Sequence, residues 1–209
     1  MFANLSGLEI AFFLIALLIS MVIHEVMHGV TAKMLGDTTA ADLGRLTLNP
    51  LKHIDVITTL LLPLVLVIFG QPPIFAAKPV PFDPTRVKFQ EYGAALVGLA
   101  GPVTNFVLAF IGAVLAHIFA SGSVQLLDFL VIFVEINVAL MVFNLIPFPP
   151  LDGSRVLYAL APEPVQEVMA RIESMGFMVI LVFIFFVFQF VAPVIQNIEA
   201  SIFNFLISI

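Results

Sequence analysis

Long apolar runs, separated by short polar or proline-rich stretches, make up most of the chain. Residues 8–35, 93–120 and 124–146 form three of these runs, and residues 177–195 form a fourth. A helix needs about 20 consecutive apolar residues to cross the hydrocarbon core of a bilayer, so each run is close to the length of a membrane span. The pattern predicts a single all-α domain over residues 1–209, a polytopic bundle of about four to six transmembrane helices.

Residues 37–92 have a different pattern, with frequent prolines and basic residues and only short apolar stretches. Apolar and polar residues alternate at 44–48 and again at 77–80, which is the period of a β-strand. Between these segments, the apolar piece 58–70 contains Pro63 and is short for a membrane span. We therefore predict a short membrane-associated β-hairpin or re-entrant region after the first helix, rather than a full crossing.

The third run ends in a proline-rich turn, residues 147–161, which contains Asp152. Apolar positions then recur at helical spacing over residues 165–174, opposite polar ones, as in an amphipathic helix on the inner membrane surface. Residues 196–209 form an amphipathic tail that either rests on the outer interface or pairs with another helix. One face of the tail carries amide and hydroxyl groups, from Asn197, Ser201, Asn204 and Ser208.

Composition agrees with a membrane protein, since 61% of the residues are hydrophobic, 11% are charged and the mean hydropathy is +1.16. The lipid bilayer is therefore an expected partner, and the lack of a basic patch argues against nucleic acid. Cysteine is absent, which excludes disulfides and thiolate metal ligands. If the first helix runs inward, all 8 Lys and Arg residues fall on the cytoplasmic side, as the positive-inside rule requires.

Three ionisable residues, His24, Glu25 and His28, stand inside the first apolar run. Residues four apart lie on the same face of a helix, so both imidazoles can reach one metal ion. Glu25 lies about 100° further round the helix, close enough to contact a water on that metal. Two buried histidines that only bond to their neighbours are the alternative, but burying three such groups without a metal is costly. The spacing indicates a zinc-dependent hydrolase.

A catalytic zinc usually takes three protein ligands and keeps one position for water, and the motif supplies only two. No further ligand follows the histidines closely, whereas Asp152 lies beside a broken membrane helix that could face them. An aspartate after a proline turn is also an ordinary helix cap, here of residues 153–160. We predict one zinc ion per chain with Asp152 as the candidate third ligand.

The apolar runs also contain asparagines. Asn105 follows Pro102 in the second run, and such a polar kink either packs against a neighbouring helix or lines a cavity. Asn137 and Asn144 lie seven residues apart in the third run, so both are expected on one face that turns into the protein.

Four segments together resemble the site-2 protease family of intramembrane zinc metalloproteases. They are H-E-V-M-H at 24–28, L-N-P-L-K-H-I-D at 48–55, G-P-V-T-N at 101–105 and F-N-L-I-P-F-P-P-L-D-G at 143–153. The resemblance covers roughly residues 1–160, in the order of the family. No stretch is long or polar enough for the PDZ or CBS domain of many members, so the chain resembles a minimal member.

The resemblance implies a zinc endopeptidase that cleaves transmembrane segments of membrane proteins, in regulated intramembrane proteolysis or in clearing signal-peptide remnants. It further implies a multi-pass protein of a bacterial or archaeal cell (inner) membrane, with its active site toward the cytoplasm. It leaves the role of His53 open. By this resemblance the zinc ligands are His24, His28 and Asp152, the general base is Glu25, and the substrate-binding residues are Asn144 and Asn105.

Two other classes of function are considered. A zinc or proton transporter could use His24, His28, Glu135 and Asp152 as a relay, although the outer helix halves then offer little beyond His117 and Asp128. A noncatalytic scaffold would leave Glu25 without a role. The sequence allows a homo-oligomer and does not require one.

Overall fold

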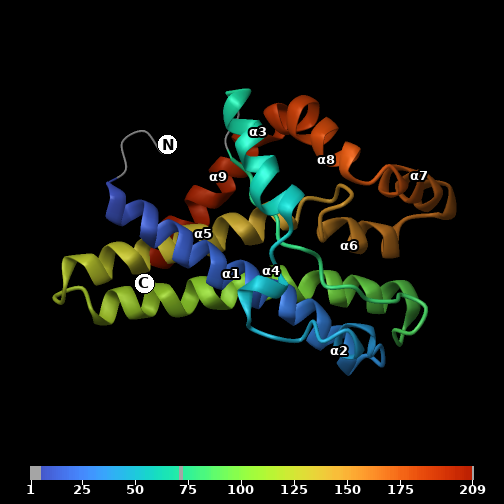
Figure 1. The fold of residues 1–209 in the computed structure, drawn as a ribbon, viewed down its shortest axis with the longest axis horizontal. Helices are drawn as coiled ribbons and strands as arrows, with labels where there is room; N and C mark the ends of the chain where they lie inside the picture. The colour runs from blue at the N-terminus through green and yellow to red at the C-terminus, as the bar shows by residue number, and fades with distance from the viewer. Residues whose placement is uncertain (1–5, 71–72, 209) are drawn as a thin grey trace.

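A computed structural model describes residues 6–70 and 73–208 of the chain (Figure 1). Residues 1–5, 71–72 and 209 lie outside the described part, including two residues of the predicted 37–92 region and the last residue of the predicted tail. Across the described residues the regular structure is helical and contains no strand. The all-α prediction is therefore confirmed.

Four helical stretches are long and apolar enough to cross a membrane: α1 (Gly7–Met34), α4 (Gln90–Ile118), α5 (Val124–Asn144) and the continuous stretch Met178–Ile207. A multi-pass membrane protein follows from these helices. The last of these stretches is divided into α8 (Phe177–Val182), η4 (Phe183–Val187) and α9 (Phe188–Ile207). The remaining elements are short. They are α2 (Thr39–Asp42), η2 (Pro50–Lys52), η3 (Val56–Leu61), α3 (Leu62–Ile68), α6 (Gly153–Leu160) and α7 (Glu163–Ser174).

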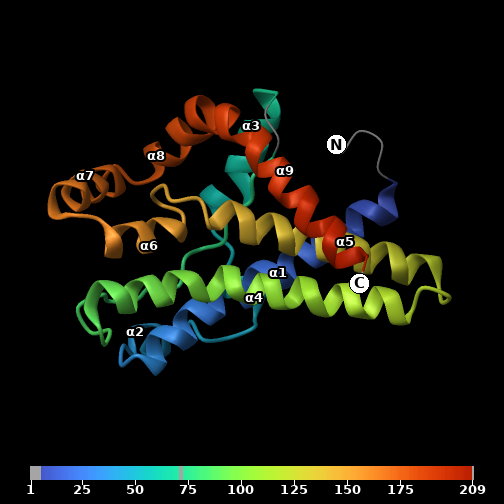
Figure 2. The same ribbon diagram turned by 180° about the vertical axis from the view of Figure 1, so that it is seen from behind.

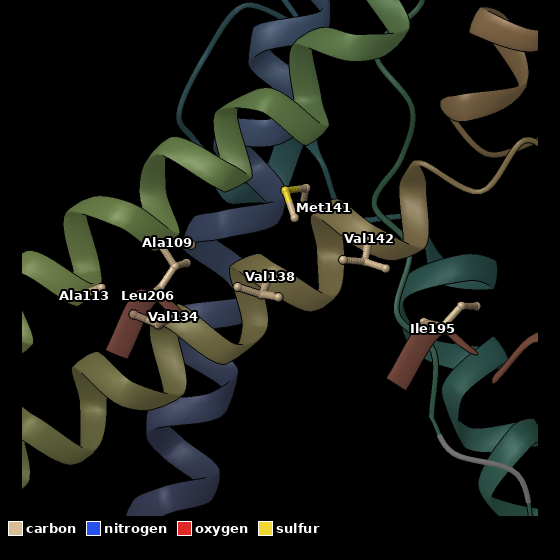
Figure 3. Close-up of a cluster of buried hydrophobic side chains, with 8 residues drawn as sticks. All are labelled: Ala109, Ala113, Val134, Val138, Met141, Val142, Ile195 and Leu206. Atoms are coloured by element: carbon tan, nitrogen blue, oxygen red, sulfur yellow. The ribbon is translucent and has the colours of Figure 1, made fainter. Parts of the chain in front are cut away.

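Helix α4 is the centre of the bundle and packs against α1, α5, α6 and α9 (Figures 1 and 2). Small residues on α4 allow this close approach, since a Cβ atom at Gly112 would lie only 3.0 Å from Val134 of α5. Next to this contact, buried residues of α4, α5 and α9 form one apolar cluster (Figure 3). Its members are Ala109, Ala113, Val134, Val138, Met141, Val142, Ile195 and Leu206.

Helix α1 ends in a turn that anchors the loop leading to α4. Gly36 has φ +112°, a conformation that favours glycine, and Asp37 follows it fully buried. The Asp37 carboxylate accepts hydrogen bonds from Thr39 and, at 2.7 Å, from the backbone N–H of Asp83. Burial raises the pKa of Asp37, but these hydrogen bonds outweigh it and hold the pKa below its usual range. Asp37 thus fixes the end of the extended segment that precedes residue 83.

The predicted β-hairpin is wrong. Residues 45–48 and 77–80 lie close together outside any helix, but they share no backbone ladder, and Gly44 belongs to a turn with φ +63°. Instead, the Arg45 guanidinium donates to the carbonyl oxygens of Lys78 and Pro79, at 2.9 and 3.3 Å. The physical reason lies in the second segment, where Pro79 and Pro81 have no N–H to donate.

The apolar piece between these segments forms a short helix, Val56–Ile68, instead of a span. Asp55 caps its start by accepting from the N–H groups of Ile57 and Thr58. Leu62 and Leu66 of this helix pack against Phe183 and Ile184 near α8. Its length is too small for a complete crossing, and its re-entrant placement in the bilayer stays a prediction.

The predicted tail is continuous with the last span. Helix α9 passes through Pro193 and reaches Ile207, and it crosses α5 in both views (Figures 1 and 2). Ile195 and Leu206 are buried in the cluster of α4 and α5. The tail therefore packs on neighbouring helices through Leu206, and its position relative to the outer membrane surface stays a prediction.

Candidate metal centre

The two histidines of α1 meet below the surface of the bundle. His24 and His28 are 6% and 7% exposed, and their Nε2 atoms lie 3.0 Å apart. Glu25, between them in sequence, completes a group of three ligand-bearing residues whose ligand atoms lie within 4.8 Å of one another. The spacing of four residues therefore places both imidazoles on one face, as the sequence predicts.

Each imidazole is oriented by a partner on α4. The Nδ1–H of His24 donates to Asn105 Oδ1 at 2.5 Å, and the Nδ1–H of His28 donates to the carbonyl oxygen of Val97 at 2.7 Å. Gly101 lies under both rings, since a Cβ atom there would lie 2.5 Å from each Nε2. With Nδ1 bonded on both rings, the two Nε2 lone pairs are left for a common ligand.

Asp152 reaches the same point from the other side. It occupies the residue before α6, but its side chain makes no capping hydrogen bond there. Its Oδ2 lies 3.0 Å from His24 Nε2 and 3.3 Å from His28 Nε2. The carboxyl group of Asp152 thus faces the Nε2 atoms of both histidines.

These three atoms are spaced as one face of a zinc site. Tetrahedral zinc with ligand bonds of about 2.0–2.1 Å places its ligands about 3.3 Å from one another. The observed separations of 3.0, 3.0 and 3.3 Å need only a small expansion to meet that geometry. Two neutral imidazoles and one carboxylate also form a donor set typical of catalytic zinc, so the residues present fit the metal.

A buried hydrogen-bond chain across three helices supports His24. Asn105 donates through Nδ2 to Asn137 Oδ1, and Asn137 donates to both Ser20 Oγ and the Phe133 carbonyl oxygen, each at 2.8 Å. Since Asn137 must donate to a carbonyl, its oxygen has to face Asn105, which in turn directs the Asn105 oxygen to His24. The chain therefore fixes the tautomer of His24.

The position of Asn105 differs from what the substrate-binding role implied by the family resemblance would require. It is fully buried and does not line the cavity beside the histidines. The sequence predicts an inward-facing Asn137 but does not show its connection to His24, and it gives no sign of the part that Ser20 takes. The signal in the sequence was a polar residue on each of three apolar runs, which indicates mutual hydrogen bonding but not its target.

Glu25 is held by the backbone of the extended segment. Its Oε2 accepts from the N–H of Val80 at 2.8 Å, and its Oε1 has no hydrogen-bond partner among the described residues. Both neighbours of Val80 in the chain are prolines, so Val80 offers the one N–H at this point. The carboxylate is thereby fixed through one oxygen, while the other stays available.

A cavity of about 350 Å³ opens beside His24, Glu25, His28 and Asp152. Its wall is mainly apolar and comes from α1, the short helix Val56–Ile68, residues 74–82, α4, α5, the proline-rich turn, α6 and the start of the last span. Asn144 is a polar exception in this wall, and its amide donates to the Leu140 carbonyl oxygen at 2.9 Å. Other wall residues include Met21, Phe75, Ala77, Phe143, Leu151 and Ile184.

Two further candidate residues lie away from this centre. His53 is 2% exposed, donates through Nε2 to the Thr47 carbonyl oxygen and accepts from the Lys78 N–H through its own carbonyl, so it joins two loops. Glu135, a member of the alternative transporter relay, is on the exposed face of α5 and has no hydrogen bond or ion pair within the described residues. No continuous relay from the histidines is formed with it.

The fold and the site define a class of protein, namely a multi-pass membrane protein with a His-Glu-His group buried in its first membrane helix. Residues 117–187 match the family model described as "Peptidase family M50". A Bacillus subtilis protein named "Putative zinc metalloprotease YwhC" is 40% identical over 179 residues, and the match covers 82% of this chain and 78% of that relative.

Two more relatives carry similar names. The "Putative zinc metalloprotease Rip2" of Mycolicibacterium smegmatis is 30% identical over 177 residues, 79% of this chain and 63% of the relative. The "Putative zinc metalloprotease MJ0611" of Methanocaldococcus jannaschii is 48% identical over 62 residues, 29% of this chain and 31% of the relative. No solved structure matches the chain. The chain belongs to peptidase family M50, the site-2 protease family, and is a zinc metalloprotease.

Proposed function

We propose that this metalloprotease is an intramembrane endopeptidase with one zinc ion per chain, and that its substrates are transmembrane segments of membrane proteins. The observation that carries the proposal is the cluster of His24, His28 and Asp152 beside Glu25, inside a bundle of membrane helices and open to a mainly apolar cavity. An apolar wall suits the side chains of a membrane span.

The three ligands and Glu25 divide the chemistry between them. His24, His28 and Asp152 would hold the zinc, which supplies a water of lowered pKa and polarises the scissile carbonyl. Glu25 takes a proton from the attacking water and delivers it to the leaving amine. The Val80 N–H fixes Glu25 Oε2, and this leaves Oε1 as the oxygen that exchanges the proton.

The extended segment supports a mode of substrate binding. Along residues 76–80, alternate N–H groups are already used: Ala76 donates to Thr58 at 3.3 Å, Lys78 to His53 at 2.7 Å and Val80 to Glu25. The N–H and C=O of Ala77 are without a hydrogen bond among the described residues, and Ala77 lies in the cavity wall. An unwound substrate strand would pair with this edge, near Asn144.

A reconstituted assay tests the proposed function. Purified protein in liposomes should cleave single-span substrates within the span, and a zinc chelator should abolish this cleavage until zinc is restored. Mass spectrometry of the products locates the cleaved bond. A matched substrate whose span has its glycine and proline residues replaced by leucine should be cleaved more slowly, since its helix unwinds less readily. Cleavage only in segments outside the membrane would contradict the proposal.

The proposed orientation places the active site toward the cytoplasm of a bacterial or archaeal cell, in its inner membrane. We expect a single cysteine at Ser123, between α4 and α5, to react with a membrane-impermeant thiol reagent on intact cells. A cysteine at Lys88, before α4, should react only after the cells are opened. The chain has no native cysteine, and both positions are exposed, so each variant reports one site. Labelling of position 88 on intact cells would refute the orientation.

A further inference from the structure

Arg45 binds the backbone that holds Glu25, although it does not line the cavity. Its Nη2 donates to the carbonyl oxygens of Lys78 and Pro79, at 2.9 and 3.3 Å. The Pro79 carbonyl and the Val80 N–H belong to one peptide group, because the C=O of a residue and the N–H of the next form a single unit. That N–H donates to Glu25 Oε2 at 2.8 Å. Arg45 and Glu25 thus bind the two ends of the same peptide group.

The peptide group between Pro79 and Val80 connects the two side chains mechanically and electrically. It is planar and trans, so its C=O and its N–H point in opposite directions. A guanidinium that holds the oxygen therefore also sets the direction of the N–H. The hydrogen bond accepted by the oxygen polarises the group as well, which strengthens the hydrogen bond that the N–H donates.

The residues before this peptide group are held by other contacts. The Thr59 hydroxyl donates to the Ala76 carbonyl oxygen at 2.7 Å, and the Lys78 N–H donates to the His53 carbonyl oxygen at 2.7 Å. Both contacts act before residue 79. Loss of Arg45 should therefore leave residues 76–78 in place and affect the peptide group that follows them.

Residues 79–81 have few contacts of their own that could orient this peptide group. They read Pro-Val-Pro and carry a single N–H. The Val80 side chain is 6% exposed and lies with Leu46 against Gly29, one turn after Glu25 on α1. Apolar packing is not directional, so it places the Val80 side chain without fixing the peptide plane beside it. The guanidinium supplies that direction.

The surroundings of Arg45 differ from those of a solvated loop arginine. The side chain is half-buried and forms no ion pair within the described residues. Its Nε is buried and has no hydrogen-bond partner there. An unpaired buried donor is unfavourable, so the guanidinium is held in an orientation that satisfies the two carbonyl oxygens and not its own Nε.

We propose that Arg45 is a positioning residue of the peptidase reaction, which orients and strengthens the Val80 N–H and thereby holds the carboxylate of Glu25. The inference rests on the proposed role of Glu25 as the general base. A displacement of about 1 Å at a catalytic group can cost about 100-fold in rate. Loss of Arg45 should therefore lower turnover, while the zinc ligands and the cavity wall, which it does not contact, stay as they are.

A double-mutant cycle tests this route. Arg45→Met should lower turnover by about 10- to 100-fold, with KM within about threefold of the wild-type value and the zinc content unchanged. In a Glu25→Gln background the same substitution should have almost no further effect, because the carboxylate that Arg45 positions is gone. Equal losses in the two backgrounds would show a general structural role and overturn the proposal, as would a wild-type rate in Arg45→Met.

The matched control is Lys52→Met, which removes an exposed cation from the same loop and should leave turnover unchanged. Arg45→Lys keeps a charged donor but not the planar guanidinium, so its turnover should lie between those of the wild type and Arg45→Met. This variant also serves if Arg45→Met does not fold. A loss from Lys52→Met as large as that from Arg45→Met would mean that any cation of the loop suffices, which contradicts the proposal.

Hydrogen exchange tests the contact without a substrate. Val80 alone among residues 79–81 has an amide hydrogen, so its exchange can be followed separately. We expect this exchange to accelerate at least about tenfold in Arg45→Met, while exchange at Lys78, which His53 holds, stays unchanged. Unchanged exchange at Val80 overturns the proposal. A wild-type protein that cleaves no membrane span would refute the proposed function, and the exchange result would still decide whether Arg45 holds this peptide group.

Discussion

Glu25→Gln is expected to lower peptidase turnover by about 10⁴, while the purified protein keeps its zinc. Removing a general base typically costs about 10²–10⁴ in rate, and Glu25 serves both the attacking water and the leaving amine, which favours the upper end. The glutamine side chain has nearly the same size, and its carbonyl oxygen can still accept from the Val80 N–H. The cleavage rate in liposomes and the zinc content by elemental analysis measure the two quantities.

The control for this variant is Glu167→Gln on α7, an exposed position away from the cavity, which should leave the rate unchanged. Near wild-type cleavage by Glu25→Gln would remove Glu25 from the role of general base. Loss of zinc together with activity would instead make Glu25 a ligand. The experiment therefore separates the two roles that a carboxylate can have beside His24 and His28.

Asp152→Ala should lose both zinc and activity, because it leaves a site with only two imidazoles. We expect the zinc dissociation constant to rise by more than about 100-fold, beyond the 10–100-fold that loss of a supporting residue costs. Competition with a chromogenic chelator measures this constant. A thermal unfolding curve of the metal-free protein shows whether the variant is still folded. Full zinc occupancy in Asp152→Ala would exclude Asp152 from the ligand set.

Two further variants allow the effect of Asp152→Ala on the zinc dissociation constant to be compared with the loss of a supporting residue and of a cavity residue. Asn105→Leu keeps all three ligands but removes the acceptor for His24 Nδ1–H, so its zinc dissociation constant should rise by about 10–100-fold. Asn144→Ala changes a residue of the cavity wall that does not contact the three ligands, and it should leave zinc affinity unchanged. If Asn105→Leu raises the zinc dissociation constant as much as Asp152→Ala does, zinc affinity does not distinguish a metal ligand from a residue that only orients one.

Sequence patterns were sufficient where local periodicity decides the structure. The lengths of the apolar runs predicted the membrane helices, and the spacing of His24 and His28 predicted that their imidazoles meet on one face. Asp152 was different, because its place before α6 is equally suited to a helix cap. Its side chain turns to the histidines only through the packing of α4 against α1 and α6, which one sequence does not show.

The β-hairpin failed for a related reason. Alternation over residues 77–80 predicts a β-strand, and these residues lie in no helix or turn, but a ladder also needs N–H groups aimed at a neighbouring strand. Prolines remove two of those groups, and Val80 gives its own to Glu25. Similarly, the sequence indicates asparagines in the apolar runs of α4 and α5 that turn into the protein. It does not show that their hydrogen bonds fix the tautomer of His24, because this depends on the packing of three helices.

The bond between Val80 and Glu25 has a consequence for comparing relatives. The donor is a peptide N–H, which every amino acid except proline carries. Position 80 can therefore exchange its side chain among homologues without changing what the carboxylate meets, as long as the replacement fits the space beside Gly29. A different side chain at position 80 in a relative would therefore not by itself indicate loss of the contact with the carboxylate, whereas a proline there would.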